Sequence, residues 1–172
     1  MKRSFAALDA QEALHVAIFI EERNAEIYHR FAEMFTEFRD PESLEIAGVF
    51  WEMAVEERRH SSMLQARYTL QYGNASCSLT EEELVEFVEV PRLEDGDIFT
   101  VNGSGADARE SALEVALTAE VSAQLFYAHL ADSTGPGPLR AIYQELAQME
   151  DGHVDFLKAK LERDNAEDRS VQ

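Results

Sequence analysis

The sequence predicts an all-α protein, an antiparallel four-helix bundle with a long connection between its second and third long helices. Three observations predict this fold: apolar residues recur at helical spacing in four long segments, capping patterns precede those segments, and no segment has the pattern of a strand. A chain of 172 residues, 45% of them hydrophobic, is long enough for one sizeable core and short for two. We therefore expect a single domain over residues 1–172.

The first two long helices are predicted over residues 9–37 and 41–72. Asp9 opens a capping-box pattern, and apolar residues follow it at helical spacing. Asp40-Pro41 is a second start signal, because a proline in the first turn removes no helical hydrogen bond. Gly73-Asn74 is a natural stop signal for the second helix. Each helix is long enough to span a domain.

The second half of the chain repeats this layout after a long connection. Residues 73–107 lack a long apolar stripe, although a capping-box pattern predicts a short helix over 80–89. Two further long helices are predicted over 108–132 and 138–163, separated by the run Gly135-Pro136-Gly137-Pro138. The connection is long enough to carry the chain from one end of a bundle to the other. The polar tail after the last helix is expected to fray.

Composition narrows the classes of function. The formal net charge is -19, from 34 acidic and 15 basic residues, which disfavours nucleic acids and anionic membrane surfaces as partners. Cys77 is the only cysteine, so an intrachain disulfide and a Cys-x-x-Cys metal site are excluded, and a reducing compartment fits best. No apolar run approaches the roughly 18 residues of a membrane span, and the N-terminus lacks a signal-peptide core. We expect a cytoplasmic protein.

The two halves of the sequence resemble each other. Positions 99 residues apart match between the first and third long helices, and positions 93 residues apart match between the second and fourth. The matched residues are Ala17, Glu21, Tyr28 and Ala32 with Ala116, Glu120, Tyr127 and Ala131, and Ala54, Glu57, His60 and Leu64 with Ala147, Glu150, His153 and Leu157. A duplicated helical hairpin is the simplest account, and it predicts an approximate two-fold axis through the bundle.

Each half carries one Glu on the apolar stripe of its first helix and a Glu-x-x-His pair on the stripe of its second. These six candidate metal ligands are Glu21, Glu57, His60, Glu120, Glu150 and His153. Four buried carboxylates without partners would be costly, and two divalent cations would balance their charge. Oxygen-rich sites with one imidazole per metal suit iron or manganese. The sequence therefore predicts two Fe ions per chain, with Mn as the alternative, in the arrangement of di-metal carboxylate bundles.

Two tyrosines and one further glutamate adjoin these ligands. Tyr28 and Tyr127 lie two turns after Glu21 and Glu120 on the same helix faces. Besides packing in the core, their hydroxyls are expected to donate hydrogen bonds to a carboxylate ligand across the bundle, a supporting role in catalysis. Glu56 precedes the first Glu-x-x-His pair, and we assign it to a solvent-facing surface.

At these residues the sequence is similar to the rubrerythrin branch of the ferritin-like superfamily. The resemblance covers residues 9 to about 162 and rests on the two Glu…Tyr spacings and the two Glu-x-x-His pairs. It implies that Glu57 and Glu150 bridge the two metals. It also implies that Glu21 and His60 complete one metal position, and that Glu120 and His153 complete the other.

Two departures from the family pattern bear on the activity. Rubrerythrins carry a rubredoxin-like domain with Cys-x-x-Cys pairs that supplies electrons, and Cys77 alone cannot build one. Many also have an extra Glu one turn after the third-helix ligand, where this chain has Ala123, with Asn24 as its counterpart. The first departure implies that electrons come from another protein or from Fe(II) itself. The second favours ferroxidase or oxidase chemistry.

The resemblance implies a di-iron carboxylate oxidoreductase of rubrerythrin-like type that reduces H2O2 or O2 while Fe(II) is oxidised. An external electron-donor protein is then required if the reaction is that of a peroxidase, and a homodimer is expected. Three alternatives stay open at this point. They are a ferritin-like ferroxidase or iron-handling protein for storage or transfer, a di-manganese catalase, and a non-enzymatic helical interaction protein.

Overall fold

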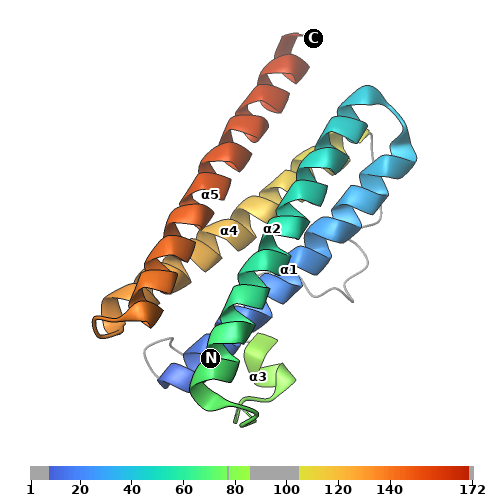
Figure 1. Cartoon of the computed structure of the whole chain (residues 1–172). Coiled ribbons are helices and arrows are strands. Elements are labelled where there is room, and N and C mark those ends of the chain that lie inside the picture. Colours follow the sequence, from blue (N-terminus) through green and yellow to red (C-terminus); the bar gives the residue numbers. More distant parts are fainter. Residues whose placement is uncertain (1–7, 77, 86–104, 171–172) are drawn as a thin grey trace.

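The computed structural model describes residues 8–76, 78–85 and 105–170. Its helices are α1 (Ala10–Phe38), α2 (Pro41–Tyr72), α3 (Glu81–Val85), α4 (Gly105–Ser133) and α5 (Pro138–Ser170) (Figure 1). The described ranges contain no strand, so the all-α prediction is confirmed. Cys77 and the predicted helical residues 86–89 lie outside the described residues. The single-domain assignment stays a prediction.

The first two helices have ends close to those predicted because their caps are local. The Asp9 side chain accepts hydrogen bonds from the backbone N–H groups of Gln11 at 2.8 Å and Glu12 at 2.9 Å, and the Glu12 side chain accepts one from the Asp9 N–H at 3.0 Å. Asp40 caps α2 in the same way through the Ser43 N–H at 2.9 Å. These short-range bonds depend on few neighbours, so the sequence predicts them well.

The last two long helices extend beyond their predicted ends. Helix α4 begins at Gly105, so that Asp107 lies in its first turn, where a negative charge interacts favourably with the helix dipole. Helix α5 continues to Ser170 instead of ending near residue 163. The added segment contains no Gly or Pro, the two residues that disfavour a helix most strongly.

The four long helices form two hairpins, α1 with α2 and α4 with α5, and the two hairpins pack together (Figure 1). Two hydrogen bonds between α1 and α4 show how these helices run. Tyr28, late in α1, contacts Glu120 in the middle of α4, and Glu21, earlier in α1, contacts Tyr127 later in α4, so the two helices are antiparallel. Helix α2 ends beside α3 at one end of the bundle, whereas α4 begins at the other end, as the predicted long connection requires. This is the arrangement of a ferritin-like helical bundle.

The bundle interior contains two apolar clusters separated by a polar layer. One cluster is built around Leu14, Phe126 and Leu146, and the other around Phe31 and Phe50. On each long helix, the predicted metal ligands fall between the residues of the first cluster and those of the second. The ligands are therefore held at mid-bundle by close-packed side chains above and below them.

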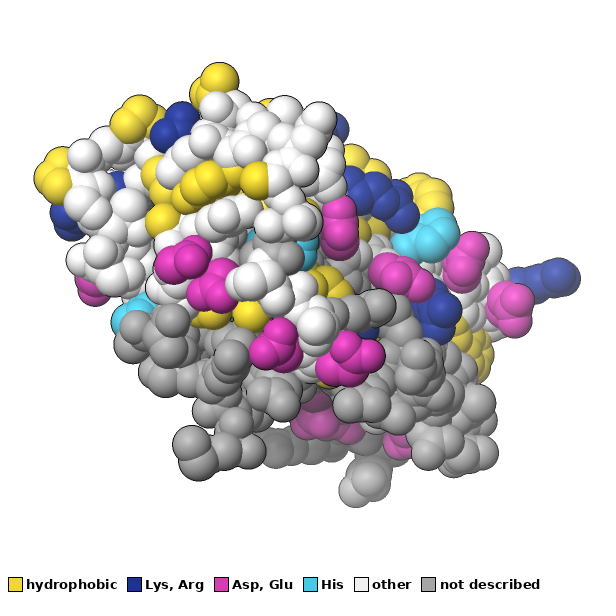
Figure 2. Space-filling model, turned by 90° about the horizontal axis from the view of Figure 1, so that it is seen from below, with side chains coloured by type: hydrophobic (Ala, Val, Ile, Leu, Met, Phe, Trp, Pro, Cys, Tyr) yellow, Lys and Arg dark blue, Asp and Glu magenta, His cyan; other side chains and the backbone are white. Residues whose placement is uncertain are grey.

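The end of the molecule seen in Figure 2 carries side chains of mixed character. Figure 2 shows one end of the molecule, where acidic side chains lie among single basic and hydrophobic ones without a continuous basic patch over the described part. None of the described helices combines the length and the apolar character needed to cross a membrane.

Candidate metal centre

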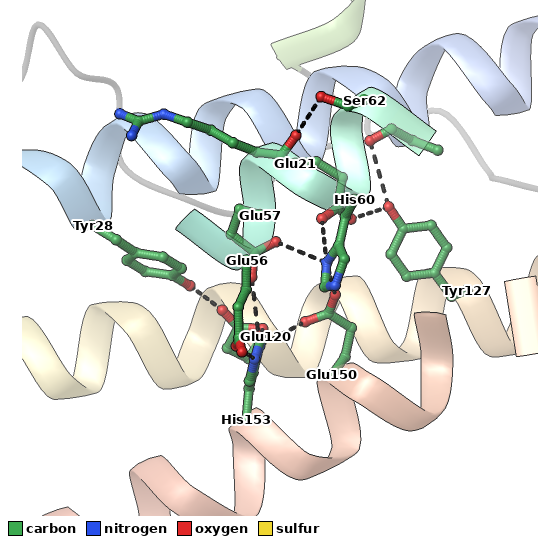
Figure 3. Close-up of polar contacts among 12 residues, drawn as sticks. Glu21, Tyr28, Glu56, Glu57, His60, Ser62, Glu120, Tyr127, Glu150 and His153 are labelled. Atoms are coloured by element: carbon green, nitrogen blue, oxygen red, sulfur yellow. Dashed lines mark hydrogen bonds and ion pairs between the residues drawn. The ribbon is translucent and has the colours of Figure 1, made fainter. Parts of the chain in front are cut away.

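The six predicted ligands meet at the middle of the bundle (Figure 3). Helices α1 and α4 each contribute one Glu, and α2 and α5 each contribute a Glu and a His. These side chains form two groups in which the possible ligand atoms lie within 4.8 Å of one another. The groups are Glu21, Glu57, His60 and Glu150, and Glu57, Glu120, Glu150 and His153. The fold thus brings all six candidates together.

Two carboxylates belong to both groups and face both histidines. Glu57 places Oε2 3.5 Å from His60 Nδ1 and Oε1 3.5 Å from His153 Nδ1. Glu150 places Oε1 3.7 Å from His60 Nδ1 and Oε2 3.4 Å from His153 Nδ1. A carboxylate with one oxygen directed toward each imidazole has the orientation needed to bridge two cations. The family resemblance implies this role for the same two residues.

The other two carboxylates each face a single histidine. Glu21 Oε2 lies 3.1 Å from His60 Nδ1, and Glu120 Oε2 lies 3.3 Å from His153 Nδ1. In both pairs the Glu and the His come from adjacent helices of one hairpin, α1 with α2 and α4 with α5. The geometry therefore repeats in the two halves, as the sequence repeat predicts.

Each tyrosine supports the carboxylate of the opposite half. Tyr28 donates a hydrogen bond to Glu120 Oε1, and Tyr127 donates one to Glu21 Oε1. Both rings are fully buried. Burial, followed by the negative charge of the neighbouring carboxylates, raises the pKa of both phenols well above 10, so each remains a proton donor at neutral pH. The hydrogen bonds expected across the bundle are present, and a part in catalysis stays a prediction.

The buried carboxylates carry more negative charge than the protein alone can balance. Burial, and then repulsion from neighbouring carboxylates, raises the pKa of Glu57 and of Glu150 well above the ordinary value. Burial also acts to raise the pKa of Glu120, but its close contacts with Glu150, His153 and Tyr28 outweigh burial and lower this pKa. The two carboxylates that face both histidines are thus the ones that most need a cation or a proton.

His153 serves as a cation in the metal-free protein. Burial acts to lower its pKa, but the hydrogen bond to Glu120 and the close negative carboxylates of Glu120 and Glu150 raise it to about 11. In this state the imidazolium replaces part of the missing positive charge. A metal ion must displace a proton from this ring to use its Nδ1 as a ligand.

Glu56 is not confined to the solvent face to which we assigned it. Its side chain is 46% exposed, yet its Oε2 lies 2.9 Å from His153 Nε2, the ring nitrogen that faces away from the other carboxylates. This contact joins α2 to α5. The difference between Glu56 and its repeat counterpart Met149 is visible in the sequence, but the side chain that Glu56 reaches depends on how the two hairpins pack.

Asn24 is a second polar residue that sequence reasoning noted without giving it a role. It lies one turn after Glu21 and one turn before Tyr28, is 1% exposed, and neither its amide oxygen nor its nitrogen has a hydrogen-bond partner. Its counterpart Ala123 is equally buried. Position 123 can therefore supply no seventh ligand, and the described site contains the six predicted ligands.

The residues present fit a metal site. Neither oxygen of Glu57 nor of Glu150 accepts a hydrogen bond from an N–H or O–H group, although all four atoms are buried. Buried polar atoms without partners are rare because each one loses its hydration without compensation. Carboxylate oxygens with one imidazole nitrogen per position are a donor set that suits iron or manganese. The cluster could therefore hold metal.

Comparisons with known proteins bear on the family and on the fold. The rubrerythrin family model matches residues 12–96, which include α1, α2 and α3. No curated protein matches the chain. A crystal structure of an uncharacterized conserved protein from Magnetospirillum magnetotacticum has the same fold, with a TM-score of 0.70 and 21% sequence identity over 91% of this chain and 95% of that one.

The family match covers the first hairpin with its ligands Glu21, Glu57 and His60. The structural match covers both hairpins, and at its level of identity it shows the fold alone. The second hairpin repeats the ligand pattern of the first. The first hairpin matches the rubrerythrin family model, and the whole chain has the fold of a ferritin-like bundle in which the Glu and His residues of the first hairpin recur in the second.

Proposed function

We propose that this protein is a di-iron carboxylate oxidoreductase of rubrerythrin-like type that reduces H2O2 or O2 while Fe(II) is oxidised. One observation carries the proposal: Glu57 and Glu150 each direct one oxygen toward His60 and one toward His153. Such a pair of shared carboxylates would hold two cations. Members of the family are usually di-iron proteins with redox activity, which supports iron as the metal.

The protein residues have separate tasks in this proposal. Two bound Fe(II) ions would supply two electrons to an oxidant. Glu21 and His60 would hold one ion, Glu120 and His153 would hold the other, and the shared carboxylates would hold both. Their charges suit cations, and the surrounding apolar clusters limit access of water to the centre.

The tyrosines would keep the terminal carboxylates in place. Tyr28 and Tyr127 remain protonated and donate to the Glu120 and Glu21 oxygens that face away from the histidines. Each hydrogen bond fixes the rotation of its carboxylate, so that the other oxygen points at the imidazole.

The test is the metal content and the absorption spectrum of the protein. After anaerobic reconstitution with Fe(II) and desalting, we expect two Fe per chain, and a near-ultraviolet absorption that develops when one equivalent of H2O2 is added. Steady H2O2 consumption with an external electron donor would support the peroxidase reaction. Failure to retain iron or manganese would overturn the proposal and would favour a non-enzymatic interaction protein.

A ferroxidase with an iron-handling role is the second candidate. Ala123 is the observation that favours it, because a buried methyl group occupies the place of the extra Glu that many rubrerythrins have. Here Fe(II) is the substrate, and aerobic loading is expected to leave many Fe(III) ions per chain. A limit near two Fe per chain would count against it. Sustained O2 release from H2O2 by the Mn-loaded protein would instead indicate a di-manganese catalase.

A further inference from the structure

The two histidines of the centre differ in the ring nitrogen that faces away from the shared carboxylates. His153 Nε2 lies 2.9 Å from Glu56 Oε2. His60 Nε2 is buried and has no hydrogen-bond partner. In the repeat, the position of Glu56 is taken by Met149, so the second half offers no carboxylate there. The candidate ligands are thus duplicated, but the hydrogen bond to the histidine Nε2 atom is present in one half only.

The contact between Glu56 and His153 determines where the imidazole carries its hydrogen. A carboxylate can only accept a hydrogen bond, so His153 Nε2 must be the donor. In the neutral ring this leaves a lone pair on Nδ1, which already lies 3.3–3.5 Å from oxygens of Glu57, Glu120 and Glu150. The ring is thus held in the tautomer and the orientation that a metal requires. No such contact selects the tautomer of His60.

Access to the centre also differs between the two histidines. The His153 side chain is 15% exposed and the His60 side chain 4% exposed. Glu56 itself is 46% exposed and lies on the outer side of the His153 ring. The His153 position is therefore closer to solvent than the His60 position.

We propose that Glu56 is a positioning residue that makes the two metal positions unequal, so that the position of Glu120 and His153 binds its ion first and more tightly than the position of Glu21 and His60. The inference rests on the proposed binuclear site. Glu56 acts through the His153 ring, not as a ligand, because its contact is with Nε2. The position without this support fills second.

The experiment is an anaerobic titration of the full chain with Co(II), followed by visible absorption in competition with a chelator. The wild-type protein is expected to bind two Co(II) in two resolved steps. Glu56→Ala is expected to weaken the tighter step about 10-fold, the lower end of the range for a lost supporting hydrogen bond, because Glu56 is half-exposed. The weaker step is expected to keep its affinity.

Two control variants separate positioning from charge. Glu56→Gln removes the charge but retains an oxygen that can accept from His153 Nε2, so it is expected to restore most of the lost affinity. Glu52→Gln removes the same charge one turn earlier on α2, at an exposed position, and is expected to leave both steps unchanged. If Glu52→Gln weakens binding as much as Glu56→Ala, the effect is general electrostatics and the proposal is wrong.

A third variant, Met149→Glu, places a carboxylate at the repeat counterpart of Glu56. Met149 is 39% exposed, and the repeat places it relative to His60 as Glu56 is placed relative to His153. Met149→Glu is therefore expected to tighten the weaker step and to bring the two affinities closer together. Mössbauer spectra of the protein with one equivalent of 57Fe(II) provide an independent measurement: one ferrous doublet is expected for the wild type, and a mixture of two for Glu56→Ala.

The outcomes distinguish this inference from the proposed function. If the wild-type chain binds neither Co(II) nor Fe(II) at two per chain, the binuclear site itself is wrong. If it binds two ions with equal affinities, or if Glu56→Ala weakens both steps alike or neither, the site stands and the positioning role of Glu56 is refuted.

Discussion

The hairpin α1–α2 and the hairpin α4–α5 present the same ligands but differ in their surroundings. Each hairpin contributes one Glu whose Oε2 lies 3.1 or 3.3 Å from the Nδ1 of a single histidine, and one Glu that faces both histidines. Each also contributes a tyrosine that donates a hydrogen bond to a Glu of the other hairpin. They differ at Glu56 and Met149, and at Asn24 and Ala123. A duplicated motif thus preserves the atoms that face the centre while the residues behind them diverge. Equal ligands need not give equal metal positions.

The largest expected effect is the loss of metal binding when a glutamate that belongs to both ligand groups is removed, compared with one that belongs to a single group. Glu57→Ala removes a residue common to both groups and should abolish binding at both positions, a loss larger than the roughly 100-fold effect of losing a supporting contact. Glu21→Ala removes a residue of one group only, so about one metal per chain should remain. Metal analysis after Fe(II) reconstitution measures both. Glu145→Ala, at an exposed position, is the control, and equal losses for Glu21→Ala and Glu57→Ala would contradict shared ligation.

The free energy of unfolding is expected to depend on pH more strongly in the metal-free protein than in the metal-bound protein. The pKa values of Glu57 and Glu150 are raised in the fold, so the stability they contribute is complete below their ordinary 4.5 and is lost as the pH rises through the raised values. His153 acts in the same direction, because its contribution is lost between the ordinary 6.5 and about 11. Glu120, whose pKa is lowered, loses its contribution only below 4.5.

We therefore expect the free energy of unfolding of the metal-free protein to fall from mildly acidic to alkaline pH, and bound metal to reduce this slope. Urea unfolding at a series of pH values, with and without a chelator, measures it. Glu57→Gln controls for the general repulsion within a chain of net charge -19, and its slope should be shallower. A metal-free protein that gains stability between pH 5 and 8 would show that the buried carboxylates are not the cause.

Variants of the two tyrosines test whether each one orients a glutamate of the other hairpin. Tyr28→Phe should weaken the metal position of Glu120 and His153 by about 10–100-fold, because the lost hydrogen bond orients Glu120. Tyr127→Phe should weaken the position of Glu21 by a similar factor. The stepwise Co(II) titration assigns each loss to a step. Weakening of the step that belongs to the tyrosine's own half would reverse the pairing described above.

The smallest effect concerns stability outside the centre. Asp9→Ala removes the side-chain cap of α1 and should lower the free energy of unfolding by about 1 kcal/mol, because two backbone N–H groups lose their acceptor. Thermal unfolding measures the change, and Asp9→Asn should retain most of the stability. The metal content should stay at its wild-type value, since α1 remains anchored by its apolar face. A loss of metal in Asp9→Ala would show that the helix end and the centre are coupled.

Much of the fold and of the candidate site could be predicted because the signals are local or repeated. The caps at Asp9 and Asp40 set the starts of α1 and α2 within one residue of prediction. The start of α4 and the end of α5 differ from the prediction, because α4 begins two residues before the Asp107 capping pattern and the polar tail after Arg163 stays helical. The six ligands stood out because polar residues occupied matching places on apolar faces in both halves.

The sequence by itself determined which residues face the interior, because helical periodicity assigns each side chain to a face and the repeat does so twice. Only the tertiary structure decided which oxygen of Glu57 and Glu150 meets which histidine, and that Glu56 reaches His153 across the gap between α2 and α5. The physical reason is that periodicity defines the direction of a side chain about its own helix axis. The relative position of two helices depends on the packing of every side chain between them.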